Sequence, residues 1–277
     1  MNNCIKITES PSLYDDLEHK TVREIIEEIN TEDQRIALAV KEVLPQIEKL
    51  VETIIPRMCK GGRLFYMGAG TSGRLGVLDA SEIPPTFGLP AGCIIGIIAG
   101  GDRALRSPVE NAEDDTEQGW NDLLAYQVNR NDTVVGIAAS GTTPYVIGAL
   151  RSARKEGLLT ASIASNPNSS VSAEVDIPIE IVVGPEYVTG SSRMKSGTGQ
   201  KMILNIISTT LMIKMGRVKG NKMVNMQLTN QKLIERGIRM LMEELHVGEE
   251  QARTLLMIHG SVSKALAAFK SCGFRPQ

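Results

Sequence analysis

The chain has 277 residues, of which 42% are hydrophobic and 22% are charged, and its formal net charge is -2. This composition is typical of a globular protein with room for one substantial α/β domain and a small appendage, and it excludes extensive disorder. The near balance of charge gives no electrostatic reason to expect nucleic acid or an anionic membrane as a partner. Any anionic ligand must therefore be held locally, by backbone amides, hydroxyls or a few cations.

Cysteine and histidine spacing gives no sign of a disulfide framework or a zinc site. The residues are Cys4, Cys59, Cys93 and Cys272, with His19, His246 and His259. None of them forms a C-x-x-C or H-E-x-x-H pattern, so we expect no metal and a reducing compartment. The N-terminal MNNCIKITES lacks an apolar signal-peptide core, and no apolar run approaches the ~20 residues that span a bilayer. We therefore expect a cytoplasmic protein.

The chain opens with helical patterns. A short helix is expected over 22–29. Thr31 and Gln34 have the spacing of a capping box, which predicts a second helix that ends near Gly61 and Gly62.

Strand and helix patterns then alternate. The expected strands cover residues 64–67, 93–99, 133–139, 158–164 and 177–183. The expected helices begin within 71–78, at Ser107-Pro108 (reaching about Gln127), at Thr143-Pro144 (ending at Gly157) and at Ser192 (reaching Met215). Strands this apolar must be covered on both faces, which predicts a three-layer αβα domain with a parallel five-stranded sheet. Ligands of such sheets bind beyond the carboxyl ends of the strands.

The pattern beyond Gly220 is purely helical. It predicts two or three short helices, and we divide the chain into a main domain over 1–225 and a small helical module over 226–277.

A glycine-rich turn follows the first expected strand. Residues 68–73 read G-x-G-x-x-G, which by itself indicates a dinucleotide site, and Asp102 after the next strand could bind the ribose. However, Thr71 and Ser72 fill the turn with hydroxyls and Arg74 follows it. Amides at a helix N-terminus together with hydroxyl donors suit a compact phosphate monoester.

Two further strand ends carry hydroxyls. Ser140, Gly141 and Thr142 follow the third strand, and Ser191 and Lys195 belong to a stretch that opens the long helix. Each turn could be only a tight connection, but the three together favour a phosphorylated sugar. Lys195, or the neighbouring Arg193, could clamp an anion or could be a solvated helix residue.

Carboxylates form the second group of candidate functional residues. Glu82 lies just before Pro84-Pro85, which we expect to stop the helix, and an acidic cluster over 110–117 occupies the expected first turns of the next one. Acidic residues at helix N-termini are often structural. A reaction that removes a proton beside a carbonyl while expelling an ether oxygen needs one base and one acid, and spacing alone leaves open which carboxylates serve, Glu110 included.

Four stretches together closely resemble the N-acetylmuramic acid 6-phosphate etherases, which have the sugar isomerase (SIS) fold. They are GRLFYMGAGTSGRLGVLDASEIPPTFG, IIAGGDRALRSPVENAEDDTEQG, VVGIAASGTTPYV and VTGSSRMKSGTGQKMILN. Weaker similarity extends over almost the whole chain. The first stretch is highly specific and disfavours the dinucleotide interpretation.

The resemblance implies a lyase that releases D-lactate from an open-chain sugar phosphate and then adds water. It places the acid on Glu82 and the base on Glu113, and the phosphate on Ser72 and Ser140 with Thr71 and Thr142 beside them. It also implies a homodimer without metal or organic cofactor.

Two features depart from the family pattern. Position 142 is threonine where family members often carry arginine, and the helical tail, which resembles a ubiquitin-associated fold, is short. Two rival functions share the fold: a sugar-phosphate-binding regulator without catalysis, and an aldose–ketose isomerase with one dominant base. Lactate release separates them. A transcription regulator is disfavoured because no basic helix-turn-helix segment is present.

Overall fold

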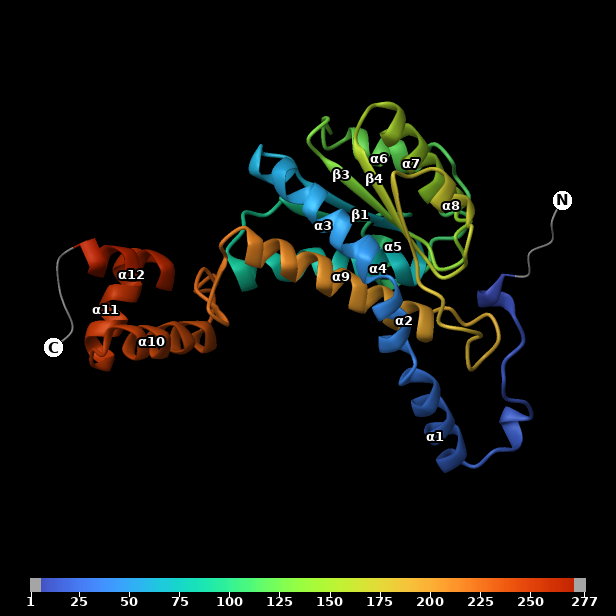
Figure 1. Ribbon diagram of the computed structural model, residues 1–277, viewed down its shortest axis with the longest axis horizontal. Helices are drawn as coiled ribbons and strands as arrows, with labels where there is room; N and C mark the ends of the chain where they lie inside the picture. Colours follow the sequence, from blue (N-terminus) through green and yellow to red (C-terminus); the bar gives the residue numbers. More distant parts are fainter. Residues whose placement is uncertain (1–5, 272–277) are drawn as a thin grey trace. The chain divides into compact units, whose positions relative to one another are not determined.

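The structure, a computed structural model, describes residues 6–271, so Cys4, Cys272 and the last residues of the tail lie outside the described part. Its centre is a five-stranded parallel sheet, which confirms the predicted fold class (Figure 1). The strands are β1 (Leu64–Gly68), β2 (Ile94–Ile98), β3 (Thr133–Ile137), β4 (Leu159–Ala164) and β5 (Ile177–Glu180).

The strand order is β2-β1-β3-β4-β5, so the direction of winding reverses between β1 and β3. At that point the last residues of the two strands, Gly68 and Ile137, are paired. Open parallel sheets bind ligands at the carboxyl edge where the winding reverses. The topology therefore brings the loops after β1 and β3 side by side at the position where a ligand is expected.

Helices cover both faces of the sheet. The helices up to residue 214 are α1 (Val22–Asp33), α2 (Ile36–Glu42), α3 (Leu44–Cys59), α4 (Gly70–Phe87), α5 (Arg103–Arg106), α6 (Gln118–Leu124), α7 (Pro144–Lys155), α8 (Ser170–Ala173) and α9 (Lys195–Lys214). Thr143 precedes α7 as its N-cap residue, as predicted. The predicted capping box at Thr31 is wrong, because Thr31 lies inside α1 and donates to the carbonyl of Glu27. The box is formed instead by Thr21 and Glu24.

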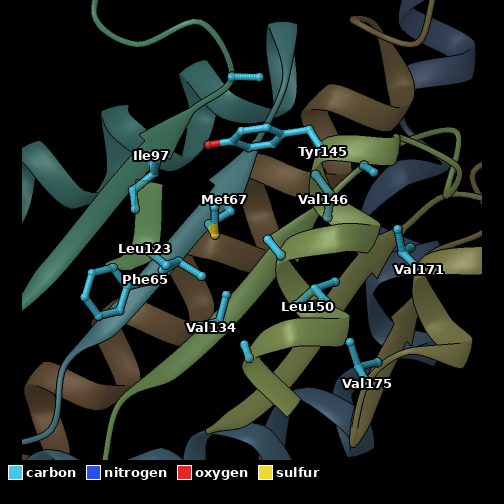
Figure 2. Packing of buried hydrophobic residues seen from close by; sticks show 14 of the residues in the cluster. Phe65, Met67, Ile97, Leu123, Val134, Tyr145, Val146, Leu150, Val171 and Val175 are labelled. Atoms are coloured by element: carbon cyan, nitrogen blue, oxygen red, sulfur yellow. The ribbon is translucent and has the colours of Figure 1, made fainter. Parts of the chain in front are cut away.

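Successive side chains of the strands point to opposite faces of the sheet, and both faces are buried. Phe65, Met67 and Val134 point toward α6 and α7, where Tyr145 and Leu150 complete one buried layer (Figure 2). Tyr66 and Ile137 point to the other face, where a Cβ on Gly76 of α4 would lie 3.0 Å and 3.4 Å from their side chains. Near-continuous apolar strands are therefore buried on both faces, as the sequence pattern indicated.

The segment after β2 differs from the prediction. A single helix was expected from Ser107 to Gln127, but residues 107–117 form turns and loop, and helix begins again at Gln118. The side chain of Asp115 accepts from the backbone amides of Glu117 and Gln118, so this carboxylate caps the start of α6. These hydrogen bonds hold the pKa of Asp115 below its usual value. Most of the acidic cluster thus lies in a loop, where carboxylates are not explained by a helix dipole.

Helix α4 continues past the two prolines that were expected to stop it. Pro84 and Pro85 lie inside it, and it ends at Phe87. Prolines remove two backbone donors from the last turn. The chain then turns at Gly88, whose amide donates to the carbonyl of Pro84 and whose φ is 62°.

The chain divides into two compact units. One comprises the chain up to Ser81 with Ile94–Ser208, and the other comprises Glu82–Cys93 with the chain from Thr209 onward. The second unit contains the hairpin of β6 (Val218–Lys219) and β7 (Lys222–Met223), which was not predicted.

Three helices beyond residue 226 share a core in the second unit. They are α10 (Gln231–Leu245), α11 (Glu249–His259) and α12 (Val262–Ser271). Ile238, Leu241, Leu256 and Ala265 are among its buried residues. The prediction of short C-terminal helices is confirmed. Over residues 6–271, no helix combines the length and apolar character needed to cross a membrane.

Candidate functional site

The turn after β1 is built by its glycines. A Cβ on Gly73 would lie 2.6 Å from the carbonyl oxygen of Gly68 and 2.6 Å from a side-chain carbon of Ile98. Gly70 has a φ of 51°, in the left-handed region that favours glycine. The glycines therefore let α4 start immediately against the strand, with its N-terminal amides at the carboxyl edge of the sheet.

Thr71 and Ser72 occupy the first turn of α4, against α9. Ser72 is buried and its hydroxyl donates to Oε1 of Gln200 at 2.9 Å, while the Nε2 of that buried amide has no partner in the described chain. The methyl group of Thr71 would lie 3.4 Å from a Cβ on Gly197. Of the two predicted phosphate hydroxyls in this turn, the half-buried Thr71 is the one not engaged by a hydrogen bond among the described residues.

The turn after β3 lies beside the turn after β1, because the two strands are neighbours in the sheet. The Ser140 hydroxyl accepts from the amide and from the hydroxyl of Thr142, both at 3.3 Å. Since Ser140 accepts twice, its own proton remains available for an anion. Gly141 has a φ of 69°, and a Cβ there would lie 2.3 Å from that of Ser169, so this position requires glycine.

The N-terminal segment contributes a cation to the same turn. Lys6 donates from Nζ to the hydroxyl of Thr142 at 2.9 Å. Its position is secured by Thr8 and Asn166, both buried, which exchange two hydrogen bonds, and Asn166 also donates to the carbonyl of Ser140. The sequence analysis missed Lys6 and Asn166, because only the fold shows that the chain start reaches this turn.

Glu113 is held beside the turn after β3. Its carbonyl accepts from the amide of Tyr145, in the first turn of α7, at 3.0 Å. The phenol of Tyr145 donates to Asp122 at 2.6 Å, and burial raises the pKa of this phenol. The tertiary contact at Tyr145 therefore fixes the backbone of the predicted base, while its carboxylate is exposed and unpaired within the described residues.

Glu113 also lines a cavity of about 340 Å³ between the turn after β1 and the loop after β2. Its lining consists of Ala69, Gly70, Arg74, Ala99, Ala104, Pro108, Val109, Glu110, Asn111, Ala112 and Glu113. The cavity thus joins the predicted base to the start of the glycine-rich turn. Glu110 lines it as well, so the choice between the two carboxylates is not decided by position alone.

Glu82, the predicted acid, is exposed and lies ten residues beyond Ser72 on α4. It belongs to the second compact unit, whereas Glu113 belongs to the first. Its backbone is ordered in the helix, just before the two prolines.

The third hydroxyl-rich stretch has a mainly structural arrangement. Lys195 is 1% exposed, and its Nζ donates to Oε2 of Glu32 at 2.6 Å. The buried carboxylate of Glu186 accepts from the amides of Lys195 and Ser196, so it already occupies the N-terminus of α9. The fold therefore uses the charge of Lys195 in this ion pair, and a contact between Lys195 and substrate stays a prediction. Ser191 is half-buried and its hydroxyl forms no hydrogen bond within residues 6–271.

Cysteine and histidine form no site in the described chain. Cys59 and Cys93 are free thiols, and residues 6–271 hold no group of three or more His, Cys, Asp or Glu side chains that could bind a metal ion.

Two family models match overlapping parts of the chain. Residues 46–154 match the glucokinase regulatory protein N-terminal SIS domain, and residues 106–213 match the SIS domain.

Curated relatives match over nearly the whole length. The N-acetylmuramic acid 6-phosphate etherase of Bacteroides thetaiotaomicron is 70% identical over 266 residues, which cover 96% of either chain. The protein of the same name from Porphyromonas gingivalis is 69% identical over 265 residues, covering 96% of this chain and 97% of that one.

Among solved structures, a phosphoheptose isomerase from Francisella tularensis is similar at a TM-score of 0.54. It is 15% identical, and the match covers 70% of this chain and 100% of that one. At that identity the likeness concerns the fold alone, and it agrees with the observed SIS architecture.

Proposed function

The chain belongs to the N-acetylmuramic acid 6-phosphate etherase family, and from this premise we propose that it cleaves the D-lactyl ether of N-acetylmuramic acid 6-phosphate. The products are N-acetylglucosamine 6-phosphate and D-lactate. The enzyme would act in the catabolism and recycling of cell-wall sugars, in the cytoplasm and as a homodimer.

The reaction proceeds through the open-chain aldehyde of the sugar. The proton on carbon 2 is acidic because it lies next to the aldehyde carbonyl. A base removes this proton, a double bond forms between carbons 2 and 3, and the ether oxygen leaves carbon 3 with a proton from an acid, as D-lactate. Water then adds to the unsaturated aldehyde, with its hydroxyl on carbon 3 and a proton returned to carbon 2.

Glu113 is the base and Glu82 the acid in this proposal. Two carboxylates suffice for both proton transfers, so the reaction needs no metal or organic cofactor. Their assignment rests on the family resemblance at these positions, and the exposed, unpaired carboxylate of Glu113 supports it.

The sugar phosphate is held by the loops after β1 and β3. Thr71 offers an unengaged hydroxyl at the N-terminus of α4, and the free proton of Ser140 lies across the point where the sheet reverses. Ser72 is a second candidate in the α4 turn, and its hydroxyl would exchange its hydrogen bond to Gln200 for one to the phosphate. Gly141 gives the second turn its shape, and Thr142 links it to Lys6. Ser191 is kept as a further candidate contact from the third stretch.

The observation that carries the proposal is the position of Glu113. Its backbone is hydrogen-bonded to the helix that follows the Ser140 turn, and it lines the cavity that begins at Gly70. A carboxylate is therefore supported next to both phosphate-type turns, in a chain about 70% identical to named etherases.

The test is an enzymatic D-lactate assay with N-acetylmuramic acid 6-phosphate, using protein treated with EDTA and untreated protein. Equal lactate release from both samples is expected, and Glu82→Gln should slow it by about 100-fold. Saturable binding of the sugar phosphate without lactate would refute the etherase and favour a regulator. Conversion to a ketose without lactate would favour an isomerase, and loss of activity with EDTA would refute the metal-free reaction.

A further inference from the structure

One cation lines the same cavity as the predicted base. We propose that Arg74 binds the carboxylate of the lactyl group and so selects substrates that carry a lactyl ether. This inference rests on the proposed function and adds a specificity-determining residue to it.

Arg74 is positioned by the fold but not neutralised by it. It follows the first turn of α4, and side chains of a helix lean toward its N-terminus, which here is the carboxyl edge of the sheet. Its Nε donates to the carbonyl of Leu105, in the short helix α5 that follows β2, at 3.1 Å. That hydrogen bond fixes one edge of the guanidinium and leaves the two terminal nitrogens for a ligand.

The cavity is lined by two carboxylates, so an anionic ligand needs a cation there to bind. Glu110 and Glu113 both line it, and Arg74 is the one cation among the described lining residues. Within residues 6–271, Arg74 forms no ion pair with either carboxylate. A substrate carboxylate that enters beside two carboxylates is repelled unless a cation compensates, and an unpaired guanidinium supplies that compensation.

The chemistry of the substrate decides which of its two anions Arg74 meets. The proton that leaves is on carbon 2 and the lactyl ether is on carbon 3, so the base and the lactyl carboxylate must share one cavity. The phosphate is on carbon 6, at the far end of the open chain. The hydroxyls of Thr71, Ser72 and Ser140 do not line this cavity, which leaves them for the phosphate.

The shape of arginine supports the same assignment. A guanidinium presents two parallel N–H groups that match the two oxygens of a carboxylate, whereas lysine provides a point charge. With Nε held by Leu105, the fork has a fixed direction and loses little freedom when it binds.

The experiment compares two substrates and several variants. N-acetylmuramic acid 6-phosphate is assayed beside its analogue with the lactyl carboxylate converted to the uncharged amide, and N-acetylglucosamine 6-phosphate is measured as the common product. The wild type should prefer the acid by about 100-fold in kcat/KM. Arg74→Gln, which keeps a donor for Leu105, should lower kcat/KM for the acid by about 100-fold and change that for the amide by less than about 3-fold.

Arg74→Lys should recover part of the preference for the acid, because it keeps the charge without the fork. Arg103→Ala is the matched control and should behave as the wild type, since Arg103 is an exposed arginine in α5, close to Leu105, but does not line the cavity. Inhibition by the product D-lactate should weaken in Arg74→Gln.

Two results would overturn the inference while the etherase stands. One is an undiminished preference for the acid in Arg74→Gln, and the other is an equal loss for both substrates, which indicates a structural role. Absence of product from the wild type with either substrate would refute the proposed function itself.

Discussion

Nζ of Lys195 lies 2.6 Å from Oε2 of Glu32, and both side chains are 2% exposed. The pair joins the start of α9 to α1, and Glu32 also accepts from Tyr14 and pairs with the more exposed Arg35. If either residue lost its partner, the other would remain as a buried charge that is stabilised neither by an ion pair nor by water. The pair therefore gives Lys195 a structural role in joining these two helices.

Replacing Lys195 with methionine should lower the free energy of unfolding by about 3–5 kcal/mol, because it leaves the Glu32 carboxylate buried with only partial compensation. Urea denaturation measures this loss, and Lys41→Met, at an exposed lysine, is the control. The double variant Glu32→Gln/Lys195→Met should be more stable than Lys195→Met alone. If Lys195→Met had unchanged stability but a raised KM, the result would instead indicate that Lys195 contacts substrate.

The same pair should make the free energy of unfolding fall at acid pH. Burial raises the pKa of Glu32, but the hydrogen bond and charge of Lys195 and the charge of Arg35 outweigh it, so the net shift is downward. A carboxyl whose pKa is lowered in the folded state stabilises the fold above its unfolded pKa, near 4.3, and loses that contribution as the pH falls. Lys195→Met should therefore lose less stability than the wild type over the pH range below about 4.3.

Ser140→Ala tests the phosphate turn. The hydroxyl of Ser140 accepts from Thr142 twice and keeps its own proton for the ligand, so its removal should raise KM for N-acetylmuramic acid 6-phosphate by about 10-fold or more. Steady-state kinetics measure this change. Ser152→Ala, toward the far end of α7, should leave KM unchanged. An unchanged KM in Ser140→Ala would place the phosphate elsewhere.

Asp79 predicts a pH effect of the opposite sign. Burial raises its pKa, although Ser208 donates to it at 3.1 Å and Tyr66 interacts with it. A raised pKa means that the charged form destabilises the fold, so this penalty is absent below the unfolded pKa and grows as the pH rises.

Asp79→Asn keeps an oxygen for Ser208 and removes the charge. Its Tm should exceed that of the wild type at neutral pH, and the difference should vanish under acid conditions. A Tm of Asp79→Asn below that of the wild type at neutral pH, with no such deficit at acid pH, would contradict this prediction.

Much of the fold could be predicted because its signals are local. Apolar runs of strand length separated by glycine and proline gave the five strands, and Thr143-Pro144 marked the start of α7. The loop at 107–117 could not be predicted in this way. Ser107-Pro108 followed by acidic residues has the local pattern of a helix start, but the backbone of Glu113 is instead bonded to Tyr145, 32 positions along the chain.

The site shows the same division between local and distant information. The glycine and hydroxyl pattern located the turns at Thr71 and Ser140, because such turns specify their own backbone. The burial of Lys195 depends on Glu32, and the presence of Lys6 at Thr142 depends on the path of the N-terminal segment. Neither partner is near in sequence, so composition and spacing carry no signal for them.

The most direct test of the account compares two carboxylates that line one cavity. D-lactate release from N-acetylmuramic acid 6-phosphate should fall by about 100-fold or more in Glu113→Gln, because a general base is lost. In Glu110→Gln, which alters the same cavity, it should stay within about 3-fold of the wild type. A large loss in Glu110→Gln with a nearly active Glu113→Gln would contradict the assignment of Glu113 as the base.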